Sequence, residues 1–486
     1  MGFDRSWLEC PEFKVFTDSQ CQRIYSAALD VLEQVGVKIF HKEALSLLKD
    51  AGAWVEASTA RIPSYMVEDA VRSAPKKIMV YTREGKPGMK LEGTSSFYGT
   101  GSDCPNILDS FTGEIRRFTA EDIAKAALIT DALPNIDFQM SLGLISDKPV
   151  EVTDLYQFQQ MVFNSSKPIV FTSHDLRGNK DIFEMASIIA GNKQELVQHP
   201  FIVHYIEPSS PLRHSKDAVD KLLFSSESGI PLIYTPCPSG GATAPVTLAG
   251  NIVLTLAESL SGVVISQLKR RGSPVIIGGV ITIMDMRTTA YCYGAAEFHL
   301  MSAALAQMSH YLRLPMFGTA GCSDSKCVDN QAAMEATLSI SMQALSGANL
   351  IHDVGYIGSG LIGSYDMLVM CDEIIGMAKR FMEGISTEDE ELAVELIHSV
   401  GPGGNFLAEE HTLKHFKTQH WHPLLMDRSE HRRWSNAGSK TLAQRTNDKV
   451  KKILEEHQPG PLDQKKKTAA AGLIQKEEKS RKLGEE

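Results

Sequence analysis

Six short apolar runs recur along this chain at the spacing of one strand, one loop and one helix. Their first residues lie 32, 31, 43, 41 and 33 positions apart, and a strand with its crossover helix takes about 30 residues or more. The runs begin at Pro168, Pro200, Pro231, Pro274, Pro315 and Ala348. Nearly every position in them is apolar, which is typical of strands covered on both faces. The repeat therefore predicts a parallel sheet surrounded by helices.

Two less regular runs, over residues 96–103 and 136–145, bring the predicted strands to eight. Eight parallel strands, each followed by a helix, define the (β/α)8 or TIM barrel, an α/β fold with its chemistry at the strand ends. We predict a helical N-terminal cap with short strands over 1–95, the barrel over 96–365, C-terminal helices packed on the barrel over 366–457, and a charged tail over 458–486. The tail is expected to be solvated helix or disordered.

Composition narrows the classes of partner. The 486 residues carry a formal net charge of −10, whereas nucleic-acid binding favours a basic surface. No apolar run reaches the roughly 18 residues of a membrane span, and the N-terminus lacks the pattern of a secretory signal. The eight cysteines are scattered and form no CxxC pair, which is typical of a reducing compartment. We expect a cytoplasmic protein that binds neither nucleic acid nor membrane.

Three short patterns match known sites but lack the companions that those sites need. Gly358-Ser-Gly-Leu-Ile-Gly363 resembles a dinucleotide loop, yet helices follow it instead of a further strand and an acidic residue. Ser323-Asp-Ser-Lys326 matches the SxxK pattern without SDN or KTG segments. His411 and His415 share one helix face, but a zinc site needs three or four converging ligands. We expect no dinucleotide, no serine nucleophile and no bound metal.

Polar and aromatic residues lie just past the predicted strands, where a barrel gathers its functional side chains. The set that we expect at one mouth is His174, Asp175, His204, Tyr205, Glu207, Tyr234, Asp285, Arg287, Asp324, Lys326, His352 and Asp353. The tyrosines at or near these strand ends are Tyr98, Tyr205, Tyr234 and Tyr356. Aromatic faces attract a cationic ligand, each contact being worth about 0.5–2 kcal/mol. The pattern favours a cation-binding mouth.

Three longer segments carry a more specific signal. The first is Thr112-Gly-Glu-Ile-Arg-Arg-Phe-Thr-Ala-Glu-Asp-Ile123 with residues 131–138, the second runs from Gly321 to Glu335, and the third covers residues 401–416 and 425–429. Together they resemble the trimethylamine methyltransferase family, over about residues 15–455. The resemblance implies transfer of a methyl group to Co(I) of a corrinoid held on a separate small protein, with no cofactor bound tightly to this chain.

The founding members of that family carry pyrrolysine, at what is here the stretch around Asp329, Asn330 and Gln331. All three positions hold ordinary residues, so the chain resembles the pyrrolysine-free branch. For that branch the implied substrate is a quaternary amine, with glycine betaine as the leading one. A quaternary ammonium leaves as a neutral tertiary amine, so its departure requires no general acid.

These implications assign candidate roles. We predict that Glu207 supplies the countercharge for the ammonium group, that Asn330 faces the pocket in place of pyrrolysine, and that His352 meets the corrinoid or its axial water. These three residues are the candidate catalytic residues. Arg287 or Lys326 would bind a betaine carboxylate. The other candidate substrate-binding residues are Tyr98, Tyr205, Tyr234, Tyr356 and His204.

Two other functions fit the same sequence. A zinc-assisted corrinoid methyltransferase would use another methyl donor, and a non-catalytic barrel would bind betaine without transferring its methyl group. The choice among glycine betaine, proline betaine, carnitine and butyrobetaine stays open at this stage. Long apolar helical segments such as residues 248–268 also allow a homodimer.

Overall fold

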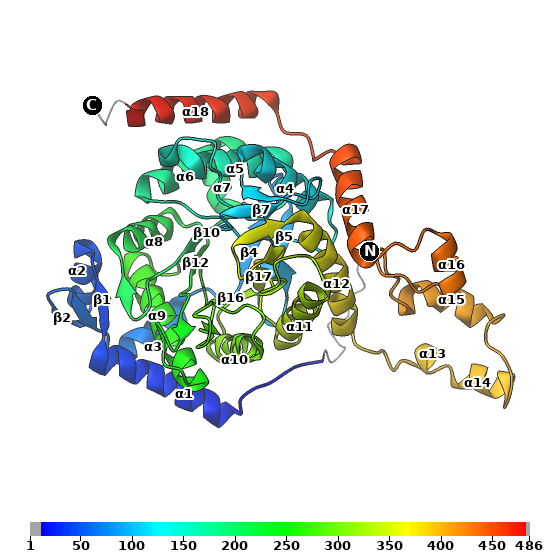
Figure 1. Ribbon diagram of the computed structural model, residues 1–486. Helices are drawn as coiled ribbons and strands as arrows, with labels where there is room; N and C mark the ends of the chain where they lie inside the picture. The colour runs from blue at the N-terminus through cyan, green and yellow to red at the C-terminus, as the bar shows by residue number, and fades with distance from the viewer. Residues whose placement is uncertain (1–10, 483–486) are drawn as a thin grey trace.

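A ring of parallel strands forms the centre of the protein in the computed structural model, which describes residues 11–482 (Figure 1). Seven strands pair side by side in the order β6-β17-β16-β14-β12-β10-β9. Their bounds are β6 Phe97–Tyr98, β9 Ile169–Phe171, β10 Ile202–Ile206, β12 Leu232–Tyr234, β14 Val275–Gly278, β16 Met316–Thr319 and β17 Leu350–His352. Each of the six apolar runs contains one of these strands, so the predicted parallel sheet is confirmed.

The segment that follows helix α4 (Ala120–Ala132) closes this sheet into a barrel. Gly99 forms a parallel bridge with Phe138, and Gln139 forms one with Ile169. Residues 136–145 therefore take the eighth place, between β6 and β9. The predicted (β/α)8 fold is confirmed, including its two least regular strand positions.

Helices surround the strands (Figure 1). Besides α4 they are α5 Thr153–Asn164, α6 Leu176–Ala190, α7 Lys193–Gln198, α8 Lys216–Ser228, α9 Leu248–Lys269, α10 Ala296–Leu312, α11 Asn330–Ser346 and α12 Tyr365–Met382. Local signals set their ends. At the start of α11 the Asp329 side chain accepts a hydrogen bond from the Ala332 N–H, and at its end Gly347 adopts a left-handed φ of 73°.

The N-terminal segment packs against this helical layer. It contains α1 Asp18–Asp30, α2 Lys42–Asp50 and α3 Ser64–Ser73. Three short strands, β1 Val37–Ile39, β2 Trp54–Glu56 and β3 Thr59–Arg61, pair with β11 Arg213–His214 in a separate sheet. Thr17 and Gln20 form a reciprocal capping box that starts α1. Helices α1, α2 and α3 all contact α9.

Helix α9 is long and apolar enough by composition to cross a membrane. However, 78 % of its most apolar window is buried within the protein. It packs against strand β14 and against helices α3, α1 and α8. Its apolar character is therefore explained by its place in the core.

A hairpin fills the end of the barrel where the strands begin. It consists of β4 Ile78–Tyr81 and β5 Pro87–Leu91. The Tyr81 N–H donates to the carbonyl of Pro200, which precedes β10, and the Arg83 N–H donates to the carbonyl of Ser166, which precedes β9. Val80 and Leu91 are fully buried and belong to one apolar cluster with the barrel interior, including Val170, Val203 and Ile276.

The opposite end carries a second small sheet, with strand order β18-β19-β7-β8. The bounds are β7 Asn106–Leu108, β8 Ile115–Arg117, β18 Tyr356–Ile357 and β19 Ile362–Ser364. Two further short strands, β13 Ser239–Gly240 and β15 Thr282–Ile283, pair nearby. Gly358, Ser359 and Gly360 all have positive φ and turn the chain from β18 into β19. The glycine pattern at 358–363 thus forms a hairpin turn.

The C-terminal region divides into docked and extended parts (Figure 1). Helix α17, Leu442–Glu456, packs on α12 and α4. Helices α13 Asp389–Leu392, α14 Val394–Val400, α15 Glu410–Gln419 and α16 His431–Asn436 form an arm beside the barrel. The backbone N–H groups of Leu424, Leu425 and Met426 donate to Glu373 of α12 and so anchor its returning end.

The charged tail is more ordered than its composition indicated. It forms α18, Gln464–Lys482, which packs on α6 and α5. Ala470, Leu473 and Ile474 are buried, and Arg177 of α6 pairs with Glu477 at 2.9 Å. These few apolar residues share one helix face, which a composition average does not reveal.

Candidate active site

Three carboxyl groups meet at the end of the barrel where the strands finish. Glu207 follows β10, Asp353 follows β17, and Asp103 lies in the loop after β6. Glu207 and Asp103 are exposed to solvent, yet burial by the surrounding protein is the largest influence that raises the pKa of each. Side chains that reach solvent while protein surrounds them on most sides line a concave surface, here the mouth of the barrel. We call these residues the mouth carboxyl cluster.

Glu207 accepts a hydrogen bond from the Tyr205 hydroxyl. Burial raises the pKa of Glu207 to about 7, the Tyr205 hydrogen bond opposes that rise, and the Asp103 carboxyl adds to it. Lys221 of α8 is a nearby cation that lowers the pKa of Glu207 in part. The Lys221 ammonium donates to the Ser173 carbonyl at 2.8 Å. Glu207 therefore changes charge near neutral pH.

Asp103 is fixed by a pair of reciprocal hydrogen bonds. The Tyr356 hydroxyl donates to its Oδ1 at 2.7 Å, and the Asp103 backbone N–H donates to the Tyr356 oxygen at 2.8 Å. Gly101 makes this approach possible, because a Cβ at that position would lie 2.2 Å from Asp353 Oδ1 and 2.3 Å from the Tyr356 ring. Tyr356 is fully buried, so it supports the cluster from behind.

His352 and Asp353 form a buried pair at the floor of the mouth. His352 Nδ1 lies 2.8 Å from the Gly318 carbonyl, and its Nε2 lies 3.3 Å from Asp353 Oδ1. Burial lowers the pKa of His352 to about 4 and raises the pKa of Asp353 well above its ordinary value. His352 is therefore neutral at pH 7, with Nδ1–H donating to the Gly318 carbonyl and Nε2 facing Asp353.

Aromatic rings surround this cluster. The His352 ring lies 4.1 Å from Phe317 and 5.9 Å from Tyr205 between centroids. In the loop after β15, Tyr291 and Tyr293 meet edge to face at 5.4 Å. Burial raises the pKa of each phenol well above the ordinary value for tyrosine. The charges of Asp353 and Cys237 raise both pKa values further. We call Tyr291 and Tyr293 the tyrosine wall.

Hydrogen bonds of the two phenol hydroxyl groups fix the position of the tyrosine wall. The Tyr291 hydroxyl donates to the Val280 carbonyl at 2.7 Å and lies 3.0 Å from Cys237 Sγ. The Tyr293 hydroxyl hydrogen-bonds Asp353 and opposes the rise in its pKa. Sequence reasoning missed both tyrosines because they follow the strand by eight or more residues. The Tyr-Cys-Tyr-Gly stretch at 291–294 was the available signal, as was the aspartate that ends the Gly-Thr-Gly-Ser-Asp run at 99–103.

Of the predicted residues, the structure brings Tyr205, Glu207, His352, Asp353 and Tyr356 together. Three others point the opposite way, into the layer between strands and helices. His204 Nδ1 lies 2.7 Å from Ser225 Oγ of α8, the Tyr234 hydroxyl lies 2.6 Å from His214 Nδ1, and the Tyr98 hydroxyl donates to the Ile340 carbonyl of α11 at 3.4 Å. Successive side chains of a strand face opposite sides, so His204 must point outward where Tyr205 points inward. Our expectation that these three line the pocket is corrected.

The two basic residues predicted to bind a carboxylate lie on exposed loops. Arg287 has 90 % of its side chain exposed and pairs with Asp285 at 3.6 Å, and the Lys326 ammonium donates to the Asp324 carbonyl at 2.7 Å. Neither is placed with the mouth carboxyl cluster. Asn330 is exposed as the first residue of α11, on the side of the barrel where the strands end. His352 lies on the buried floor of the mouth, and its contact with the corrinoid or its axial water stays a prediction.

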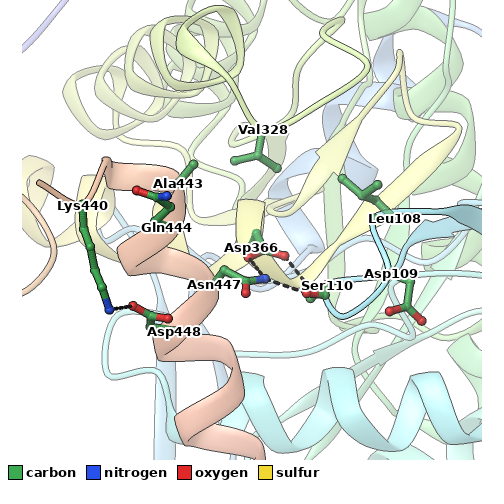
Figure 2. A pocket seen from close by; sticks show the side chains of 11 residues that line it. Leu108, Asp109, Ser110, Val328, Asp366, Lys440, Ala443, Gln444, Asn447 and Asp448 are labelled. Carbon is green, nitrogen blue, oxygen red and sulfur yellow. Dashed lines mark hydrogen bonds and ion pairs between the residues drawn. The ribbon is translucent and has the colours of Figure 1, made fainter. Parts of the chain in front are cut away.

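Other candidate sites are separate from the mouth. A cavity of about 490 Å³ lies between α17 and the β7–β8 hairpin (Figure 2). Its polar side chains already bond one another: Asn447 donates to Asp366 at 3.0 Å, and Lys440 pairs with Asp448 at 2.7 Å. Within residues 11–482, no three His, Cys, Asp or Glu side chains are grouped to hold a metal ion.

A closed (β/α)8 barrel with carboxyl groups and tyrosines at the ends of its strands has the architecture of a barrel enzyme. The chain belongs to the trimethylamine methyltransferase (MTTB) family, whose profile matches residues 6–481. It is therefore a member of a family of methyltransferases, as the three sequence segments indicated.

Two relatives show how far the similarity reaches. The chain is 34 % identical to a trimethylamine methyltransferase MttB of Desulfitobacterium hafniense (strain DSM 10664 / DCB-2), with 95 % of this chain and 94 % of the relative covered. It is 29 % identical to a glycine betaine methyltransferase of Desulfitobacterium hafniense (strain Y51), with 93 % and 95 % covered. The crystal structure of the Methanosarcina barkeri monomethylamine methyltransferase (MtmB) aligns with a TM-score of 0.53 at 14 % identity, over 92 % of this chain and 88 % of that chain. This last likeness supports the fold alone.

Proposed function

We propose that this protein transfers a methyl group from a quaternary amine, with glycine betaine the leading substrate, to Co(I) of a corrinoid carried by a separate protein. The observation that carries the proposal is the mouth itself, where three carboxyl groups and the tyrosine wall gather at one end of the barrel. Carboxylates and aromatic faces are the groups that attract an organic cation, and each ring contact adds about 0.5–2 kcal/mol.

The residues at the mouth have different roles according to their charge. Glu207 is the carboxyl group that ionises near neutral pH, so it supplies the countercharge for the ammonium. Beneath it His352 is neutral and pairs with Asp353, whose pKa burial raises well above its ordinary value. Tyr205 and the tyrosine wall limit where the methyl groups can lie. Orienting a reactant in this way can contribute several kcal/mol to a transfer reaction.

The corrinoid supplies the nucleophile, so the chain itself needs no side-chain nucleophile. The departing tertiary amine is neutral, which fits a mouth whose floor offers an un-ionised histidine instead of a charged acid. The chain then has to bind the cation, orient one methyl group toward the open end of the barrel and exclude water. Asp103, Glu207 and the wall do the first of these tasks.

The choice of glycine betaine rests on two features. The stretch 329–331 holds no pyrrolysine, and a relative covering nearly the whole chain is named a glycine betaine methyltransferase. With Arg287 and Lys326 on exposed loops, Lys221 becomes the candidate for the substrate carboxylate, because its charge already acts on Glu207. Trimethylamine, named for the other relative, would have no use for that lysine.

We propose the cytoplasm as the site of action, in line with the unpaired cysteines among the described residues. The partners in this proposal are the methylated amine and the corrinoid protein.

A spectral assay tests the proposed function. The protein is mixed with a Co(I) corrinoid and, in turn, glycine betaine, proline betaine, carnitine, butyrobetaine and trimethylamine. We expect conversion to methyl-Co(III) with a quaternary amine, fastest with glycine betaine. No conversion with any donor would refute the function, and conversion with trimethylamine alone would refute the substrate. Activity lost on chelation together with stoichiometric zinc would favour the zinc-assisted alternative.

A further inference from the structure

The loop that carries the tyrosine wall joins β15 to α10, and its tip is exposed to solvent. Its first half folds on itself around Asp285, which accepts hydrogen bonds from the N–H groups of Arg287 and Thr288 at 2.7 and 3.2 Å. The residues from 286 to 290 are exposed. A loop with a self-contained, exposed tip needs an anchor elsewhere to fix the position of its rings.

Asp324, in the loop after β16, provides that anchor. Its Oδ1 accepts the Tyr293 N–H at 2.9 Å, and its Oδ2 accepts the Gly294 N–H at 2.8 Å. The Ser359 hydroxyl, from the β18–β19 turn, donates to the same Oδ1 at 2.9 Å. One carboxylate therefore joins three loops of the mouth. Charge-assisted hydrogen bonds of this kind are about twice as strong as neutral ones.

Asp324 is itself held by Glu335 of α11. Glu335 Oε2 accepts the Asp324 N–H at 2.8 Å and the Ser323 hydroxyl at 2.6 Å, while Oε1 accepts the Gln331 amide at 2.8 Å. Gly294 lies against this carboxylate so closely that a Cβ would be 2.3–2.7 Å from its atoms. The two acidic side chains thus form a latch between the start of α11 and the wall, which we call the Asp324–Glu335 latch.

The latch also gives a structural role to two acidic residues that have no part in the proposed methyl transfer. Asp324 and Glu335 both belong to the recognisable segment from Gly321 to Glu335. Neither is among the mouth carboxyl cluster, and the oxygens of Asp324 already accept three hydrogen bonds. A carboxylate with its lone pairs committed to backbone N–H groups positions a neighbour and does not bind a substrate cation.

We propose that Asp324, seated on Glu335, is the positioning residue that sets Tyr291 and Tyr293 against the bound ammonium and so determines amine affinity. That the ligand is a methylated ammonium rests on the proposed function; the role of the latch rests on the geometry. The proposal places the control of affinity in the loop after β16, away from the reacting groups. It predicts an effect on amine binding that leaves the corrinoid half of the reaction unchanged.

The test compares two Asp→Asn variants, one in the latch and one at the tip of the loop that carries the wall. Asp324→Asn keeps the size of the side chain but sets an amide N–H against a backbone N–H, so the wall loses one anchor. Asp285→Asn is the matched control, because Asp285 accepts two backbone N–H groups at the exposed tip of the same loop. Binding of tetramethylammonium is measured by titration calorimetry, and steady-state assays give KM for the amine and for the Co(I) corrinoid.

We expect Asp324→Asn to weaken tetramethylammonium binding about tenfold, the loss of roughly one good ring contact. KM for the amine should rise by a similar factor, with kcat and the corrinoid KM near their wild-type values. Asp285→Asn should bind as wild type does. Wild-type affinity in folded Asp324→Asn, or a fall in kcat with an unchanged amine KM, would overturn the proposal.

A second variant covers the case in which Asp324→Asn does not fold. Glu335→Gln keeps one acceptor oxygen for the latch and should raise the dissociation constant for tetramethylammonium about threefold; unchanged binding would contradict the latch. Binding needs no methyl transfer, so the two proposals fail separately. A protein that binds tetramethylammonium through the latch but methylates no corrinoid refutes the function alone. A wild-type protein with no affinity for tetramethylammonium refutes the latch.

Discussion

The two ends of this barrel are built from opposite kinds of residue. Where the strands begin, the β4–β5 hairpin inserts Val80 and Leu91 into a dry apolar cluster. Where they end, Glu207 and Asp353 are surrounded by protein that raises the pKa of each carboxyl group. Apolar burial adds stability, whereas crowding carboxyl groups lowers it. The hairpin end therefore stabilises the fold, whereas the opposite end holds groups that cost stability, as functional sites often do.

The largest expected effect comes from the hairpin end. Leu91→Ala should lower the free energy of unfolding by about 2–5 kcal/mol, because it removes buried methyl groups from a closed cluster. The folded fraction should keep its wild-type kcat, since Leu91 lies at the far end of the strands. Chemical denaturation with a parallel methyl-transfer assay checks both. A variant that loses kcat while keeping its stability would break the division between the ends.

At the mouth, Glu207→Gln should reduce kcat/KM on the order of 100-fold while leaving the protein folded, because the cation loses its countercharge. Glu258→Gln is the matched control. Burial also raises the pKa of Glu258 to about 7, but this residue lies in α9 and accepts the Ser210 hydroxyl at 2.8 Å. That control should change stability and leave kcat/KM within about twofold. Equal losses of activity in both variants would contradict the role of Glu207.

The same glutamate predicts a pH dependence of binding. The pKa of Glu207 is raised from 4.5 to about 7 by burial, with Tyr205, Asp103 and Lys221 as the other groups acting on it. Tetramethylammonium does not titrate, so its dissociation constant should fall about tenfold as pH rises from 6 to 8 and Glu207 ionises. Glu207→Gln should remove this dependence, and calorimetry at several pH values measures it. A flat wild-type profile would show that another group balances the cation.

Rising pH has the opposite effect on stability: ionisation of Glu207 strengthens cation binding but lowers the free energy of unfolding. Between pH 4.5 and 7 the folded protein keeps a proton on Glu207 that the unfolded chain has lost. The contribution of Glu207 to the free energy of unfolding therefore falls as pH rises through this window. Added tetramethylammonium should restore stability most at pH 8, which thermal unfolding with and without the cation would reveal.

The smallest effects distinguish the two faces of the strands. Tyr205→Phe should raise KM for the amine about threefold to tenfold, because Glu207 loses its hydroxyl donor. Tyr234→Phe should leave KM unchanged and lower the free energy of unfolding by about 1–2 kcal/mol, because Nδ1 of the buried His214 loses its partner. Steady-state kinetics and chemical denaturation of both variants test these two expectations. A raised KM for Tyr234→Phe would place that residue at the mouth after all.

The strands were predictable because their signal is local and strong. The runs from Pro168 to Pro315 are apolar at most strand positions, and every strand residue in them is buried. The same uniformity hides which residues face inward. Tyr205 and His204 are neighbours in one run, and only the pairing of β10 with β9 and β12 decides which of them reaches the mouth.

The rest of the site depends on contacts between distant segments. Asp103 reaches the mouth because Gly101 lets the chain pass Tyr356 and Asp353, and the tyrosine wall is held by Asp324 from another loop. Neither relation leaves a periodic pattern in the sequence. The β4–β5 hairpin was expected only as short strands within the cap over 1–95, since its role follows from the barrel end that it fills.

The central claim is that a methylated cation binds between Glu207 and the tyrosine wall. Arsenobetaine, the arsenic analogue of glycine betaine, tests it directly, because the arsenic atom can be located by anomalous diffraction in a crystal soaked with it. We expect one strong peak within about 6 Å of the rings of Tyr291 and Tyr293 and beside the Glu207 carboxylate. A peak in the cavity between α17 and the β7–β8 hairpin (Figure 2), with none at the mouth, would contradict it.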